Sequence, residues 1–200
     1  MPQSIHPTKS RLIETTAELL ESQFPEDIQV DEILEKSGIS KGSLYHHFED
    51  LGELLEAAQV SRYAGWVDRS IGLIVPVLSS ARNRDDIIEG LKTLTKYTQS
   101  PEYKATRFTR ARALAKSETS SRFQRALGLE QERLNVALQD LVEEAKNKGL
   151  FKASLDSHVV AVFIQSYTLG KIVDDIVPVP MGQENWDNFI LDMLIATMVS

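Results

Sequence analysis

The stretch Gly38-Ile39-Ser40-Lys41-Gly42-Ser43-Leu44-Tyr45-His46-His47-Phe48 contains a tight turn and the short helix that follows it. Glycine at position 38 can adopt the left-handed backbone conformation that ends one helix and begins such a turn. Ser40 can cap the next helix by accepting a hydrogen bond from a backbone N–H in its first turn. That helix is too short to have a core of its own, but Leu44 and Phe48 lie four residues apart and can hold it to its neighbours. The segment therefore predicts a helix-turn-helix.

The opposite face of this short helix is polar and aromatic. Its outward residues are Lys41, Ser43, Tyr45, His46 and His47. A short helix that is supported rigidly from behind and exposes such residues is suited to the major groove of DNA. We therefore expect the chain to bind double-stranded DNA.

The preceding segment Val30-Asp31-Glu32-Ile33-Leu34-Glu35-Lys36-Ser37 strengthens this interpretation. Together with the stretch from Gly38 to Phe48, it closely resembles the DNA-binding domain of the TetR (tetracycline-repressor-like) family. The resemblance is strong over residues 8–56, and the remainder is similar only in length, helicity and order of elements. It implies a homodimeric, ligand-responsive repressor that binds a palindromic operator and releases it when a small-molecule effector binds the C-terminal domain. Activators and co-repressed members also exist in this family.

The resemblance also implies which residues contact DNA. Tyr45 and His46 match family positions that contact phosphates or bases, and Gln29 stands where the family often has threonine or serine. The backbone N–H groups at the start of the recognition helix favour a phosphate, and glycine at position 42 allows close approach. For His47, packing against the first helix is an equal alternative. The predicted DNA-binding residues are Lys9, Gln29, Ser40, Lys41, Gly42, Ser43, Tyr45, His46 and His47.

Length and composition favour a two-domain intracellular protein. Two hundred residues, 42% of them hydrophobic, suit a DNA-binding domain over residues 1–50 and an effector-binding and dimerisation domain over residues 51–200. The chain has no cysteine, which excludes disulfides and cysteine-bearing metal sites. No segment resembles a signal peptide or reaches the ~18 apolar residues of a membrane span, so we expect a cytoplasmic protein without a membrane partner.

Charge is the feature that fits DNA binding least well. The formal net charge is −7, and residues 1–50 hold four Lys or Arg against ten Asp or Glu, a net charge of −6. A DNA-binding domain usually has a basic surface, because neutralised phosphates supply most non-specific affinity. Leu51 is a second departure from the family, since the family usually has lysine or another polar residue at that position. The alternative function is therefore a small-molecule- or partner-binding protein on the same fold with weakened DNA binding.

Hydrophobic spacing along the chain is helical rather than strand-like. We expect an all-α fold, with an N-terminal three-helix helix-turn-helix domain and a C-terminal helical ligand-binding and dimerisation domain. The fourth helix begins near Asp50, which has capping-box spacing with Glu53, and Pro76 is expected to end or kink it. The expected helices cover residues 8–23, 30–37, 41–48, 50–76, 85–97, a segment starting at 100, 120–148, 156–177 and 186–199.

The last two expected helices, over residues 156–177 and 186–199, are apolar on nearly all sides. A helix that is apolar all round must be buried all round, and the same pair from a second subunit is the expected cover. The resemblance agrees, because TetR-like proteins dimerise through their last two helices; a helix pair in the core of a monomer is the alternative. The predicted interface residues are Phe163, Tyr167, Gly170, Val173, Trp186, Phe189, Ile190, Met193 and Leu194.

The effector site is predicted from residue type alone, as apolar walls with a few polar groups. The candidates are Tyr63, Trp66, Phe108, Arg112, Phe163 and Tyr167. Aromatic residues at helical spacing also serve as ordinary core, so that alternative stands beside the first. The basic stretch from Lys104 to Arg125 holds either an anionic effector on one or two inward arginines or, as the favoured alternative, a solvated face.

No arrangement in the sequence supports catalysis. The four histidines are His6, His46, His47 and His158, and none forms an His-x-x-x-His pair. With no cysteine and no glycine-rich phosphate loop, neither a thiol nucleophile nor a zinc site is expected. We therefore expect no enzyme activity, no metal and no cofactor. An enzyme and a membrane-associated helical protein remain the less favoured classes.

Overall fold

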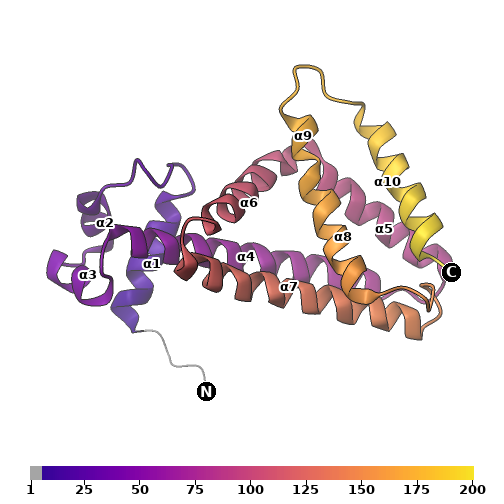
Figure 1. The fold of residues 1–200 in the computed structure, drawn as a ribbon, viewed down its shortest axis with the longest axis horizontal. Coiled ribbons are helices and arrows are strands. Elements are labelled where there is room, and N and C mark those ends of the chain that lie inside the picture. The colour runs from indigo at the N-terminus through magenta and orange to yellow at the C-terminus, as the bar shows by residue number, and fades with distance from the viewer. Residues whose placement is uncertain (1–5) are drawn as a thin grey trace. The chain divides into compact units, whose positions relative to one another are not determined.

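The structure is a computed structural model that describes residues 6–200. Within this range the fold is all-α, as predicted, and the β structure is limited to an isolated bridge between Phe151 and Val199. The helices are α1 (Pro7–Leu19), α2 (Val30–Ser37), α3 (Lys41–His47), α4 (Leu51–Ser79), α5 (Arg84–Gln99), the 3-10 helix η1 (Pro101–Tyr103), α6 (Lys104–Ser117), α7 (Ser121–Asn147), α8 (Ser157–Gly170), α9 (Ile172–Asp175) and α10 (Gln183–Met198) (Figure 1). Among the described residues, no helix is both long and apolar enough to cross a membrane.

The chain forms two compact units, and the boundary between them does not lie at residue 50. Unit 1 contains the described residues up to Trp66 together with Ser117–Glu130, and unit 2 contains Val67–Lys116 and Gln131–Ser200. The difference from the predicted domains has a physical reason. Leu54 and Ala58 of α4 belong to the same buried cluster as the helix-turn-helix. The helices α1 to α3 therefore complete their core with residues beyond position 50.

Unit 1 contains the helix-turn-helix that the sequence predicts. α1 packs on α2 and α3, and Leu44 and Phe48 lie in their shared core. Gly38 follows α2 with φ of 70°, the left-handed conformation that favours glycine. Ser40 caps α3, and its side-chain oxygen accepts a hydrogen bond from the backbone N–H of Ser43 at 3.2 Å. The local signals in the motif are thus all realised.

The start of α4 also follows the sequence prediction, whereas its end does not. The Asp50 carboxylate accepts a hydrogen bond from the Glu53 N–H, and the Glu53 carboxylate accepts one from the Glu49 N–H, each at 2.7 Å. The helix passes through Pro76 and ends at Ser79. As a result, α4 has residues in both units.

In unit 2, α10 packs along α5 and buries Ile190 and Leu194 in an apolar cluster (Figure 1). The single helix predicted over residues 156–177 is wrong. It divides into α8 and α9 at Lys171, directly after Gly170, a residue type with low helix propensity. Lys171 and Asp175 are both buried, so this segment of chain is held by polar contacts as well as by packing.

Candidate DNA-binding surface and effector unit

The recognition helix α3 presents the polar face that its sequence predicts. Lys41, Gly42, Tyr45 and His46 are exposed, and Ser43 and His47 are half-buried. A Cβ atom added to Gly42 would meet no neighbouring atom, so the surface above it is open. α3 itself has no acidic residue, since the acids of this region lie outside Lys41–His47. The helix can therefore approach an anionic groove with its own surface free of like charge.

Two predicted DNA contacts lie beside α3 rather than on it. The Nζ atom of Lys9 in α1 lies 4.9 Å from the centroid of the Phe48 ring, a cation–π contact that fixes where the ammonium group is held. Gln29 is exposed at the N-cap of α2 and does not cap it with its side chain. Its amide nitrogen donates to the Asp27 carbonyl oxygen at 3.4 Å, a long and weak bond. Both side chains remain available to a phosphate.

His47 packs against the residue before α1, as the alternative for it allowed. Its ring centroid lies 4.8 Å from that of His6 and 5.1 Å from that of His46. Burial lowers the pKa of His47, and the nearby positive groups of His6, His46 and Lys9 lower it further. His6 was not among the predicted DNA-binding residues. Its ring caps α1 by accepting a hydrogen bond from the Thr8 N–H at 3.2 Å.

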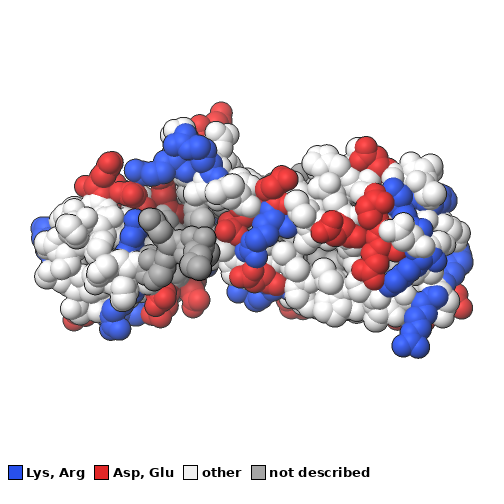
Figure 2. Space-filling model, turned by 90° about the horizontal axis from the view of Figure 1, so that it is seen from below, with Lys and Arg blue, Asp and Glu red and all other residues white. Residues whose placement is uncertain are grey.

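The acidic character of this region is distributed around the helix-turn-helix. Glu18 of α1 pairs with Lys36 of α2 at 3.2 Å, and Arg122 pairs with Glu56 at 2.8 Å and with Glu49 at 3.8 Å. On the face drawn in Figure 2, Lys and Arg side chains stand beside Asp and Glu side chains. Leu51 packs against the apolar core, which explains a leucine at that position. In unit 1, Lys36 and Arg122 are thus already paired with acids of the same chain.

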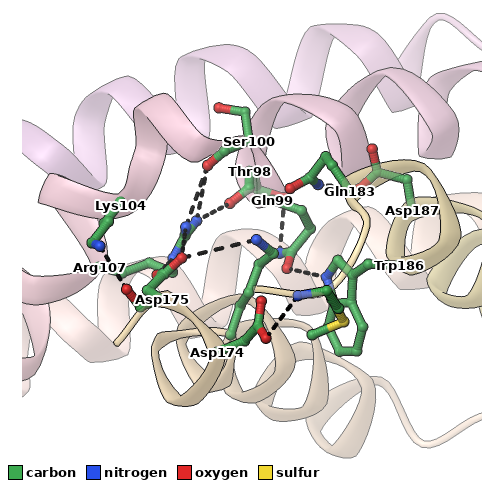
Figure 3. A network of polar contacts seen from close by, with 12 residues as sticks. Thr98, Gln99, Ser100, Lys104, Arg107, Asp174, Asp175, Gln183, Trp186 and Asp187 are labelled. Carbon is green, nitrogen blue, oxygen red and sulfur yellow. Dashed lines mark hydrogen bonds and ion pairs between the residues drawn. The ribbon is translucent and has the colours of Figure 1, made fainter. Parts of the chain in front are cut away.

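Unit 2 contains a buried polar network that the sequence analysis did not locate (Figure 3). Arg107 of α6 is 0% exposed, and it forms hydrogen bonds of 2.5 and 2.8 Å with the two carboxylate oxygens of Asp175 in α9. The same guanidinium group donates to the carbonyl oxygens of Thr98 and Ser100 at 3.1 and 3.3 Å. One arginine therefore joins α6 to α9 and to the carboxyl end of α5.

Further contacts extend this network. The Nζ atom of Lys104 donates to the Asp175 carbonyl oxygen at 2.5 Å, and the Lys171 ammonium lies 3.9 Å from the Asp175 carboxylate. The Trp186 indole N–H of α10 donates to the side-chain oxygen of Gln99 at 2.8 Å. The basic stretch of α6 is thus not a solvated face at Arg107 and Arg110, both of which are buried. Arg107 is already neutralised by a carboxylate of the same chain.

The pKa shifts of Tyr167 and Asp175 reflect the burial of these side chains. Burial raises the pKa of Tyr167 to about 12, although the hydroxyl of Thr95 acts in the opposite direction. For Asp175, burial is the largest influence and acts to raise the pKa. The hydrogen bonds and charge of Arg107, followed by the charges of Lys171 and Lys104, outweigh burial and hold the pKa of Asp175 below its usual value. Asp175 therefore remains ionised although its side chain is buried.

Comparison with known proteins agrees with the geometry of unit 1. The family model described as bacterial regulatory proteins of the tetR family matches residues 12–58. An uncharacterized HTH-type transcriptional regulator, TtgW of Pseudomonas putida, is 34% identical over 55 residues, which are 28% of this chain and 41% of that protein. Residues 12–58 therefore form a tetR-type regulatory domain. The chain spans less than half the length of the curated relative that it matches.

Solved structures extend the TetR-like fold to nearly the whole chain. A candidate TetR-family transcriptional regulator from Mesorhizobium loti superimposes with a TM-score of 0.71 at 17% identity, covering 96% of this chain and 97% of that one. GusR of Salmonella enterica gives 0.64 at 20% identity, covering 98% and 97%. A transcriptional regulator from Saccharomonospora viridis in complex with choline gives 0.65 at 14% identity, covering 96% and 97%. At these identities the likeness concerns the fold alone.

The residues predicted for a TetR-type effector site fall into both units. Tyr63 and Trp66 contact each other in unit 1, with ring centroids 5.2 Å apart. Phe163 and Tyr167 contact each other in unit 2, at 5.4 Å. In the same unit, Phe108 lies 5.9 Å from the Lys104 ammonium. Arg112 is exposed on α6. The structure thus forms two aromatic pairs from the predicted set, and the effector site itself stays a prediction.

The residues predicted for a TetR-type dimer interface divide into two groups. Ile190 and Leu194 are buried in the core of unit 2, and Trp186 and Met193 pack against that core. Tyr167 also packs there. By contrast Phe163, Gly170, Val173 and Phe189 are exposed, Val173 at 71% and Phe189 at 62%. Further exposed apolar residues on and after α8 and α9 are Val159, Val162, Ile176, Val177 and Val179. The second group is the surface that a partner can cover.

Proposed function

We propose that this protein is a transcriptional regulator that binds a palindromic DNA operator as a homodimer and releases it when a small molecule binds unit 2. The observation that carries the proposal is the exposed polar face of α3, held by Leu44 and Phe48 on a TetR-type domain. In such a dimer, two copies of α3 enter major grooves about 34–36 Å apart. Because an effector can shift the equilibrium only by binding the two states unequally, it must favour the state whose spacing fits DNA less well.

The helices that the two units share support coupling between the units. The helices α4 and α7 each contribute residues to both units, so continuous helices can carry a displacement within unit 2 to unit 1.

The exposed apolar residues of α8 and α10 support the homodimer, because monomeric soluble proteins rarely expose contiguous apolar patches of large area. The choline complex of the Saccharomonospora viridis protein shows that a small molecule binds that fold.

A selection experiment tests the DNA-binding half of the proposal. We expect the purified protein to enrich, from a random duplex library at near-physiological salt, a palindrome with half-sites about one helical turn apart. In a salt titration, the logarithm of its affinity should fall linearly with the logarithm of salt concentration, with a slope of about −0.9 for each neutralised phosphate. A folded dimer that enriches no motif and shows no salt slope would contradict the proposal.

That negative result would favour the second candidate function, a small-molecule- or partner-binding protein that has weakened DNA binding. The net charge of −6 over residues 1–50 and the packing of Leu51 into the core are the specific observations in its favour. Binding of a small molecule with no linked change in DNA affinity would distinguish it from a regulator.

Two glycines in the motif offer a matched pair of substitutions. Gly38→Ala should destabilise unit 1 by about 1–2 kcal/mol, because φ of 70° is strained for any residue with a Cβ atom. Gly42→Ala has open space around it and should not destabilise the fold, since alanine is the better helix former. Its methyl group should nevertheless weaken operator binding by keeping the backbone away from DNA. Urea denaturation and fluorescence anisotropy measure the two effects, and equal affinity of Gly42→Ala and wild type would contradict a close approach at α3.

A further inference from the structure

Three of the four histidines of this chain lie together beside the recognition helix. His6 precedes α1, whereas His46 and His47 are the last two residues of α3. The His47 ring contacts both of the others, with centroids 4.8 and 5.1 Å apart. Lys9 of α1 is near enough to affect His47 electrostatically. We call His6, His46 and His47 the histidine cluster.

The charged groups that act on His47 are all basic. Besides the three imidazoles, Lys9 of α1 acts on His47, and Arg11 of the same helix is directed to the Ser37 carbonyl oxygen, at 2.6 Å. The acids that follow α3 in the chain are engaged elsewhere: Glu49 lies 3.8 Å from Arg122, and Asp50 caps α4. Among residues 6–200, no carboxylate forms an ion pair with Lys9 or with an imidazole of the cluster. The cluster therefore lacks an internal anion.

The free protein disfavours the charged form of His47. The mutual repulsion of close cations and partial burial both oppose the charging of His47. His6 uses the lone pair of its Nδ1 atom to cap α1, and a ring that carries protons on both nitrogens has no lone pair for this bond. Within the described residues, no group of three or more His, Asp or Glu side chains is arranged to hold a metal ion.

We propose that the histidine cluster binds the phosphate backbone of DNA and takes up protons when it does so, which makes operator affinity depend on pH. The inference rests on the proposed DNA-binding function. A phosphodiester stays anionic near neutral pH and supplies the negative charge that the cluster lacks. An imidazolium ring donates from both nitrogens, whereas a neutral ring donates from one, so the protonated cluster makes the stronger contact. His6 thereby becomes a DNA-contacting residue in addition to those on α3.

The direction of the pH effect follows from linkage. If the complex binds more protons than the free protein, the affinity for DNA rises as pH falls. The rise occurs between the higher pKa of His47 in the complex and its lowered pKa in the free protein, and affinity is flat on either side. Within that window the gain is up to about tenfold per pH unit for each proton taken up. Each imidazolium that meets a phosphate also makes the salt slope more negative by about 0.9.

The test measures affinity against pH and salt with the full chain. The probe is a fluorescently labelled duplex of about 30 base pairs, long enough for two half-sites. The test variant combines His6→Ser, His46→Gln and His47→Gln, because serine is a good N-cap and can replace the cap of His6. The control is His158→Gln, which alters the remaining histidine, exposed on α8 in unit 2. Circular dichroism at each pH confirms that the variants stay folded.

We expect wild type and His158→Gln to gain at least about tenfold in affinity from pH 8 to pH 6, with a steeper salt slope at the lower pH. The triple variant should bind more weakly, because it lacks the contacts of His46 and His47, and it should show neither change. An equal pH slope in the triple variant would overturn the inference, since the protons would then bind elsewhere. A wild type that binds DNA without any pH slope would also overturn it. Absence of DNA binding at every pH would instead overturn the regulator function and the inference with it.

Discussion

Asp175→Ala is expected to destabilise the protein by about 3–5 kcal/mol, because it leaves the Arg107 guanidinium group buried without its counter-charge. Arg107 is fully buried, and its other partners are the carbonyl oxygens of Thr98 and Ser100, which carry no formal charge. Loss of the pair also removes the side-chain connection of α9 to Arg107, so that Lys104 of α6 holds α9 only through the Asp175 carbonyl oxygen (Figure 3). Urea denaturation followed by far-ultraviolet circular dichroism measures the change in free energy of unfolding.

A double variant separates the cost of an unpaired charge from the value of the pair. Arg107→Met combined with Asp175→Leu removes both charges of the pair and fills similar volume, so it should recover part of the stability lost in Asp175→Ala. The recovery is partial because the buried Lys171 ammonium still lacks the carboxylate beside it. Equal destabilisation by the single and the double variant would contradict the explanation. In that case the hydrogen bonds to Thr98 and Ser100, rather than the neutralised charge, would hold this region together.

The same pair predicts how acid affects unit 2. The pKa of Asp175 is lower in the folded protein than its usual value, so its ionised form contributes stability above the unfolded pKa of about 3.9. That contribution is lost as pH falls through the lower folded pKa. Asp175→Asn should therefore be less stable than wild type at neutral pH but lose less further stability on acidification.

The helix-turn-helix was predictable because its determinants are local. The left-handed Gly38, the cap of Ser40 and the spacing of Leu44 and Phe48 all act within a few residues, and each is present in the structure. The capping interaction of Asp50 with Glu53 is local in the same way. Sequence patterns specify such features without knowledge of the rest of the fold.

The polar network of unit 2 was missed because its determinants are distant in the chain. Arg107 and Asp175 lie 68 positions apart, and nothing near either residue indicates the other. One signal was available in α5, where the apolar stripe of Ile87 and Leu91 continues at the same four-residue spacing with Thr95 and Gln99, both buried. Polar residues on a core-facing stripe indicate an internal polar site. The break between α8 and α9 depends on these contacts and was missed with them.

The extent of unit 1 was missed for a related reason. Phe123 and Leu127 of α7 are buried in the unit that contains the helix-turn-helix, although they lie 76 and 80 positions after His47, the last residue of α3. Helical periodicity indicates which residues of a helix face a core, but it cannot say which core they join.

Phe189→Asp is expected to convert the proposed homodimer to monomer and to lower operator affinity at least about 100-fold. The Phe189 side chain is 62% exposed on α10, whereas its neighbour Ile190 is buried within the chain. A charge at position 189 therefore leaves the core of the protomer intact and places an unpaired carboxylate in the apolar face that we assign to the partner. Operator affinity falls because a monomer binds each half-site separately and loses the high effective concentration of the second recognition helix.

Sedimentation velocity measures the association, and fluorescence anisotropy measures affinity for the selected palindrome and for an isolated half-site. Leu129→Asp is the matched control, since Leu129 is an equally exposed apolar residue on α7 outside the proposed interface. We expect the control to remain dimeric and Phe189→Asp to bind the half-site as well as wild type does. This pattern would locate the defect in dimerisation rather than in the reading surface of α3. A dimeric Phe189→Asp with full operator affinity would show that the exposed face of α10 is not where two copies of the chain meet.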